Sequence, residues 1–288
     1  MNRPGRLLLS PPSETQRARA QIADASRHDS WASGDSYDAY IGRWSRQIAP
    51  LFLEWVVAGP GLRWLDVGCG TGVLSQAIIE YCDPADLIGV EPAESFRERA
   101  RAVISDPRAR FEAGDAAALP LDDGNCDVAV SGLVLNFVPD RERALAEMKR
   151  VTAAGGTVAF YVWDYPGGGL ELLRAFWTAA TALDPAAEAL TESRRFSYCE
   201  PRSLTALARS GGLGEVAVEA IEVPCVFRDF DDYWRPFTLG TGPAPGYYLS
   251  LPQEGRDALQ AKLESDLPRG NDGSIPLKAR AWAVRGRA

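Results

Sequence analysis

A chain of 288 residues can bury a full hydrophobic core, and one α/β domain with insertions fits this length better than two equal domains. With 31 basic against 39 acidic residues, the net charge of −8 repels phosphate backbones and argues against nucleic acid as a partner. Five cysteines without a CxxC pair, no signal-peptide core and no run of ~18 apolar residues predict a cytoplasmic protein without a metal site or a membrane span.

The first half of the chain alternates strand-like and helix-like segments. Residues 36–57 carry apolar side chains at three- and four-residue steps, which predicts a helix that Pro50 could kink or divide. Apolar runs predict strands at 61–68, 86–92, 109–116, 126–137 and 155–165, separated by helices at 73–82, 94–105 and 140–152. This order indicates βαβ units and a parallel sheet with helices on both faces.

The second half is less regular. Helices are predicted at 170–183 and 201–212, and strands at 215–227 and 274–287. The intervening residues 228–273 are too long for a turn and should contain helices of their own. We therefore expect a flexible arm at 1–30, which contains the single histidine, His28, and one domain at 31–288 with insertions at about 165–212 and 228–273.

A glycine-rich loop follows the first predicted strand. Asp66 is followed by Gly68, Gly70 and Gly72, and then by a helix. Such a loop brings a ligand against backbone N–H groups at the positive end of a helix. The spacing G-x-G-x-G differs from the G-x-G-x-x-G of dinucleotide sites, and the preceding acid would repel a pyrophosphate. The loop therefore favours a cationic ligand.

The stretch LDVGCGTG (65–72) resembles motif I of the class I S-adenosylmethionine (SAM) dependent methyltransferases, and other segments resemble that family in the same order. Glu91 closes the second strand, where the family's acid binds both ribose hydroxyls. GDAAALP (114–120) and SGLVLNFVPD (131–140) resemble the segments after the third and fourth strands. The resemblance covers roughly 36–165, and its nearest members include quinone-biosynthesis methyltransferases.

The resemblance implies SAM as cofactor and S-adenosylhomocysteine as product. It implies that Asp115 meets the adenine amino group and that Arg43, in a segment similar to the family's N-terminal helix, meets the cofactor carboxylate. Tyr37 or Tyr40 could cover the cofactor. The predicted cofactor-binding residues are Tyr37, Tyr40, Arg43, Asp66, Gly68, Cys69, Gly70, Gly72, Glu91, Pro92, Asp115, Ala116, Ser131 and Leu133.

The acceptor is expected beyond the carboxyl ends of the strands, where ligands bind in open α/β sheets. Asp164 or Tyr165 is predicted to orient or deprotonate an acceptor hydroxyl, and Arg195 to hold an acidic group. Aromatic residues on the later segments suggest an apolar, planar acceptor under a lid, although rings can also simply pack an insertion onto a sheet. The predicted acceptor-binding residues are Asn136, Phe137, Trp163, Trp177, Arg195, Phe196, Phe230, Tyr233 and Trp234.

These observations together predict a Rossmann-like, doubly wound α/β fold with seven strands, mostly parallel, and an antiparallel last strand, as the resemblance implies. The predicted function is SAM-dependent methylation of a small aromatic or apolar molecule at oxygen, with nitrogen or carbon as alternatives, by a monomer or homodimer. Three other functions stay open: a SAM-fold protein that is a cyclase or has a structural role, a nicotinamide-dependent oxidoreductase, and a methyltransferase for macromolecules.

Overall fold

The computed structural model describes residues 41–239 and 242–288. The predicted arm, His28, Tyr37 and Tyr40 lie outside the described residues.

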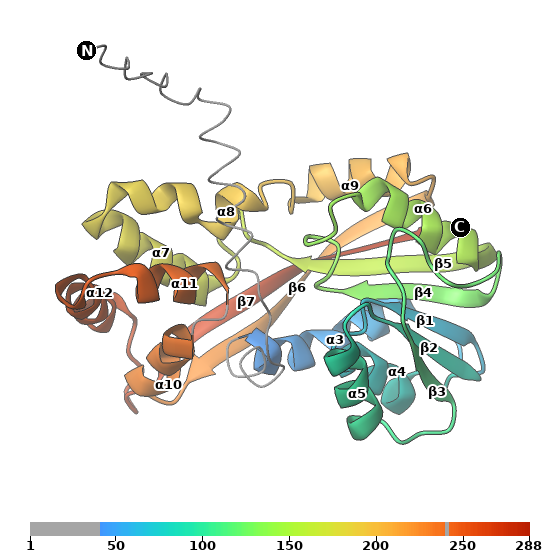
Figure 1. Ribbon diagram of the computed structural model, residues 1–288, viewed down its shortest axis with the longest axis horizontal. Coiled ribbons are helices and arrows are strands. Elements are labelled where there is room, and N and C mark those ends of the chain that lie inside the picture. Colours follow the sequence, from blue (N-terminus) through green and yellow to red (C-terminus); the bar gives the residue numbers. More distant parts are fainter. Residues whose placement is uncertain (1–40, 240–241) are drawn as a thin grey trace, which may run out of the picture.

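A seven-stranded sheet forms the centre of the molecule, in the order β3-β2-β1-β4-β5-β7-β6 (Figure 1). Strand β7 pairs antiparallel with β5 and β6, whereas the pairs among β1 to β5 are parallel. This confirms the predicted sheet with its antiparallel last strand. The strands are β1 Arg63–Val67, β2 Asp86–Val90, β3 Ala109–Glu112, β4 Cys126–Gly132, β5 Thr152–Trp163, β6 Gly214–Phe227 and β7 Ile275–Arg287.

Helices cover both faces of the sheet, because both faces of its central strands are apolar. Helix α3 packs against α4 on one face, and α6 packs against α9 on the other (Figure 1). Helix α3 runs unbroken through Pro50, so the predicted division there is not found. These helices are α3 Arg43–Val56, α4 Val73–Tyr81, α5 Glu94–Val103, α6 Arg141–Val151 and α9 Pro201–Ser210.

Apart from α9, the helices of the two predicted insertions form an outer helical layer beyond the far end of the long strands β6 and β7 (Figure 1). Helices of the first insertion contact helices of the second, chiefly α7 against α12. The layer has an aromatic core in which Phe176 stacks on Phe237 at 4.6 Å between ring centres. Its members are α7 Glu171–Leu183, η3 Pro185–Leu190, α8 Glu192–Arg195, α10 Phe230–Trp234, η4 Arg235–Leu239, α11 Pro243–Ser250 and α12 Gln253–Asp266.

Two strands end earlier than predicted. Strand β4 ends at Gly132, not at residue 137, because Leu133 has a left-handed backbone (φ 62°) that extended structure cannot accommodate. The following residues form a turn in which the N–H of Phe137 donates to the carbonyl of Val134 at 2.8 Å. Strand β3 likewise ends at Glu112, because residues 113–116 leave its pairing with β2. Both turns bring loop residues to the carboxyl edge of the sheet.

Candidate functional site

The loop between β1 and α4 requires its glycines. Gly68, Gly70 and Gly72 all have positive φ angles, of 71°, 53° and 91°, which L side chains rarely adopt. A Cβ at Gly68 would also lie 2.5 Å from the Val134 side chain. The loop is therefore pressed against the turn that follows β4, and the two segments form adjoining walls of one pocket.

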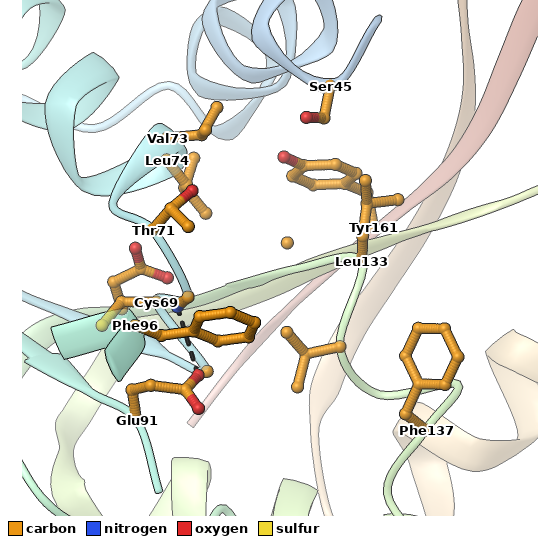
Figure 2. Close-up of a pocket in the computed structure, with 15 residues that line it drawn as sticks. Ser45, Cys69, Thr71, Val73, Leu74, Glu91, Phe96, Leu133, Phe137 and Tyr161 are labelled. Atoms are coloured by element: carbon orange, nitrogen blue, oxygen red, sulfur yellow. Dashed lines mark hydrogen bonds between the residues drawn. The ribbon is translucent and has the colours of Figure 1, made fainter. Parts of the chain in front are cut away.

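This pocket lies at the carboxyl ends of β1, β2, β4 and β5 (Figure 2). Its position matches the crevice in which open α/β sheets bind their ligands. The walls are mostly apolar, and two carboxylates lie among them. The lining residues are Ser45, Asp66, Gly68, Cys69, Gly70, Thr71, Val73, Leu74, Glu91, Phe96, Gly132, Leu133, Val134, Phe137 and Tyr161.

Asp66 brings a buried, incompletely bonded carboxylate to the pocket. The residue is 1% exposed, and the hydroxyl of Ser75 donates to its Oδ2 at 2.7 Å. Its Oδ1 has no hydrogen-bond partner among the described residues. Burial raises the pKa of Asp66 to about 7, the bond from Ser75 opposes this rise, and the nearby Glu91 carboxylate adds to it. A cation in the pocket would satisfy Oδ1 and restore the charged form.

Glu91 lies beneath the glycine loop, held by backbone donors. The N–H of Gly70 donates to its Oε2 at 3.2 Å, and the N–H of Ala93 donates to its Oε1 at 3.0 Å (Figure 2). Burial raises the pKa of this carboxyl, and both backbone bonds oppose the rise. Because each carboxylate oxygen has two lone pairs, Glu91 can still accept from two neighbouring hydroxyls of a ligand.

Ser45 and Tyr161 lie on the opposite side of the pocket from Glu91 (Figure 2). Tyr161 of β5 is 2% exposed and is paired in register with Gly132 of β4. The sequence analysis missed both residues, because each sits inside a regular element whose pattern predicts only core packing. The signal that could have identified Tyr161 is a polar tip near the carboxyl end of a central strand.

Six of the fourteen predicted cofactor-binding residues line the pocket: Asp66, Gly68, Cys69, Gly70, Glu91 and Leu133. Gly72 instead precedes α4 as its N-cap, and the Ser131 hydroxyl donates to the Val67 carbonyl at 2.8 Å, between two strands. Asp115 is exposed and accepts a bond from the N–H of Ala117 at 2.7 Å. Among the described residues, the pocket lining does not include Pro92, Asp115 or Ala116.

Arg43 has other contacts than the predicted one. Its guanidinium donates to Asp232 of α10 at 3.1 Å and lies between the rings of Trp44 and Phe227, at 4.4 and 4.5 Å. A guanidinium held by a carboxylate and two rings is already neutralised and stacked. In the structure Arg43 therefore joins α3 to the outer helical layer, and the contact with a cofactor carboxylate stays a prediction.

Both carboxylate oxygens of Asp164 accept hydrogen bonds from neighbouring residues. Arg280 of β7 donates to its Oδ2 at 2.8 Å, and the N–H of Gly167 donates to its Oδ1 at 2.9 Å. The residue is 1% exposed and lies outside the lining of the first pocket. Because both oxygens are engaged, Asp164 is poorly placed for the predicted role as a base. Its neighbour Tyr165 lines a second cavity, between α7 and α8.

The predicted acceptor-binding residues fall into three groups: residues at or near the two cavities, the buried Asn136, and aromatic residues that pack elsewhere. Phe137 lines the first pocket, Trp177 lines the second cavity, and the ring of Phe196 lies near Phe137 with Arg195 over its face. Neither amide atom of the buried Asn136 has a hydrogen-bond partner among the described residues. The aromatic residues that instead pack within the sheet or the outer layer are Trp163, Phe230, Tyr233 and Trp234.

Two classes of feature are missing from the described ranges. Residues 41–239 and 242–288 contain no group of three or more His, Cys, Asp or Glu side chains that could hold a metal ion. The same ranges contain no helix with the length and apolar character needed to cross a membrane.

Comparisons with known proteins agree with this geometry. A family model described as a methyltransferase domain matches residues 65–160. The malonyl-[acyl-carrier protein] O-methyltransferase of Geobacter sulfurreducens is 33% identical over 186 residues, which are 64% of this chain and 67% of that protein. The demethylmenaquinone methyltransferase of Roseiflexus castenholzii is 28% identical over 172 residues, and the match covers 55% of this chain and 71% of that protein.

A solved structure shares the fold. Phosphoethanolamine N-methyltransferase 2 of Haemonchus contortus, solved with phosphomonomethylethanolamine and S-adenosylhomocysteine, superposes with a TM-score of 0.51 at 14% identity, covering 84% of this chain and 52% of that one. The chain spans about half the length of four further curated relatives, between 40% and 56% of each.

Proposed function

The chain belongs to the class I SAM-dependent methyltransferases, and from this premise we propose that it methylates a small molecule, at oxygen and on an aromatic framework. When bound, SAM supplies a methyl group already activated by the positive charge on sulfur. The protein then has to bind the cofactor, orient the acceptor and keep water out. Alignment of the reacting atoms accounts for much of the acceleration in such a reaction.

The single observation that carries the proposal is the unpartnered buried oxygen of Asp66 in the pocket beneath the glycine loop. A buried carboxylate without full compensation is costly, so its presence points to a positively charged ligand. A pyrophosphate would be repelled at the same place. Glu91 then suits the two hydroxyls of a ribose.

On the side of the pocket opposite the glycine loop, few groups could act as a base. The two carboxylates of the lining lie by the glycine loop, and the opposite side has the hydroxyls of Ser45 and Tyr161 between apolar walls (Figure 2). Such walls exclude water from the methyl group. This arrangement supports an acceptor oxygen that ionises readily, such as a phenol, because it needs little help in losing its proton.

Two measurements test the proposal. Calorimetry with the purified protein should show SAM and S-adenosylhomocysteine binding and no NAD binding. Incubation with methyl-labelled SAM and a set of phenols should then transfer label to at least one of them. Failure to bind SAM would refute the proposal. Binding without transfer to phenols, carboxylic acids, amines or proteins would favour a cyclase or a structural role.

A further inference from the structure

Ser75 of α4 contacts the carboxylate of Asp66 across the glycine loop. The hydroxyl of Ser75 donates to Oδ2 of Asp66 at 2.7 Å, between residues nine positions apart in the chain. Both residues are buried, with exposed fractions of 0% for Ser75 and 1% for Asp66. Strand β1 ends at Val67 and α4 begins at Val73, so the two residues stand on either side of the loop. The hydrogen bond therefore joins the strand to the first turn of the helix.

This hydrogen bond fixes the orientation of the Asp66 carboxylate. The torsion that turns the carboxyl group of an aspartate is broad, so an unrestrained carboxylate rotates easily. Ser75 holds Oδ2, and the planar group leaves Oδ1, which has no hydrogen-bond partner among the described residues. Because Asp66 lines the first pocket, this arrangement keeps an acceptor oxygen available for a positively charged ligand there.

The same hydrogen bond favours the charged form of Asp66. Burial raises the pKa of this carboxyl to about 7, and the Ser75 hydroxyl is the largest influence against that rise. The Glu91 carboxylate adds to the rise. Burial also raises the pKa of Glu91, and its backbone bonds and the nearby Arg97 oppose this. Cys69 of the loop stays a neutral thiol, because burial raises its pKa as well.

We propose that Ser75 is a positioning residue for the cofactor: its hydroxyl holds the Asp66 carboxylate in one orientation and in its charged form, ready for a cationic ligand. This inference rests on the proposed function, in which that ligand is SAM. Among the described residues, the lining of the pocket does not include Ser75. Ser75 therefore acts on the cofactor through Asp66.

The pH dependence of SAM binding separates this role from simple packing. Calorimetry on the full chain measures the SAM affinity of the unchanged protein and of Ser75→Ala between pH 6 and pH 9. Without the hydroxyl, the pKa of Asp66 should rise by about one unit, because a hydrogen bond to a charged group is a strong one. Ser75→Ala should then bind SAM about tenfold more weakly at pH 6. The ratio of the two affinities should shrink between pH 7 and pH 9, and the titration of SAM itself cancels in this ratio.

Three further variants locate the effect. Ser203→Ala removes a similar hydroxyl, which donates to Glu200 at 3.0 Å at the exposed start of α9, and it should leave SAM affinity unchanged at every pH. Asp66→Asn has no charge to maintain, so adding Ser75→Ala to it should cause no pH-dependent loss. Ser75→Cys keeps nearly the same size with a weaker donor. If Ser75→Ala fails to fold, Ser75→Cys should change the pH dependence in the same direction.

Each outcome bears on one claim. A loss of SAM affinity by the same factor at every pH would overturn the inference, because lost packing alone has that effect. An unchanged affinity in Ser75→Ala, an equal loss in Ser203→Ala, or a pH-dependent loss that persists in the Asp66→Asn background would also overturn it. If the unchanged protein binds no SAM, the proposed function is refuted. Normal SAM binding without the expected pH dependence refutes only the role of Ser75.

Discussion

Gly132 and Tyr161 are register partners on the adjacent strands β4 and β5, and the phenol oxygen of Tyr161 lies where a Cβ at residue 132 would be only 2.7 Å away. Any side chain at residue 132 would therefore displace the phenol. This close approach places the hydroxyl of Tyr161 at the side of the pocket opposite Glu91 (Figure 2).

We expect Gly132→Ala to lower the free energy of unfolding by about 1–3 kcal/mol, because the added methyl group would clash with the closely packed Tyr161 side chain. SAM affinity should fall as well, since the displaced phenol lines the pocket. Tyr161→Phe should partly restore stability in the double variant, because the nearest clashing atom is its oxygen. Chemical denaturation and calorimetry measure both effects. Additive effects of the two substitutions would contradict the explanation.

The pH dependence of stability should report on Asp66. Its pKa is raised to about 7 in the folded protein, so between pH 4 and 7 the folded state binds more protons than the unfolded state. Stability should then fall as the pH rises through this range, by at most about 1.4 kcal/mol per unit, and level off above it. Asp66→Asn should flatten this slope. The free energy of unfolding is measured at several pH values, with and without SAM, for both proteins. If its dependence on pH is the same in Asp66→Asn as in the unchanged protein, Asp66 is not its source.

Glu91→Gln should weaken SAM binding by about tenfold or more, because a neutral amide accepts hydroxyl bonds less strongly than a carboxylate. The maximal transfer rate should change little, since Glu91 is proposed to bind the ribose, which is distant from the methyl group. Glu98→Gln is the matched control, as its carboxylate is exposed on α5 and lies outside the pocket lining. Calorimetry with SAM distinguishes the two, and equal losses in both variants would mean that Glu91 is not a ligand residue.

Asp164→Asn should behave as a stability variant. It leaves the Arg280 guanidinium without its buried partner, so we expect unfolding to become easier by about 2 kcal/mol, less than a fully buried pair would lose, because Arg280 is 29% exposed. SAM affinity should stay the same. Denaturation measures the stability, and calorimetry measures SAM affinity. Turnover is measured under conditions in which the variant stays folded. A loss of turnover without a loss of stability would instead indicate that Asp164 takes part in the chemistry.

The alternation of strands and helices, the glycine loop and the acid at the end of β2 follow from local pattern. Apolar runs, turn glycines and an acid at a strand end are each specified by neighbouring residues, and parallel strands bring their carboxyl ends to one edge. The sequence analysis therefore named several residues that line one pocket, and their contact with a cofactor stays a prediction. It extended β4 too far because apolar residues continue past Leu133, whose backbone turns away.

Partners that lie far apart in the chain could not be read from such patterns. Arg43 meets Asp232, 189 residues away, and Asp164 meets Arg280, 116 residues away. Likewise, the position of Tyr161 depends on its register with Gly132. Local periodicity says which face of an element is apolar, whereas the choice among distant charged partners is made only when the packed elements bring their side chains within reach.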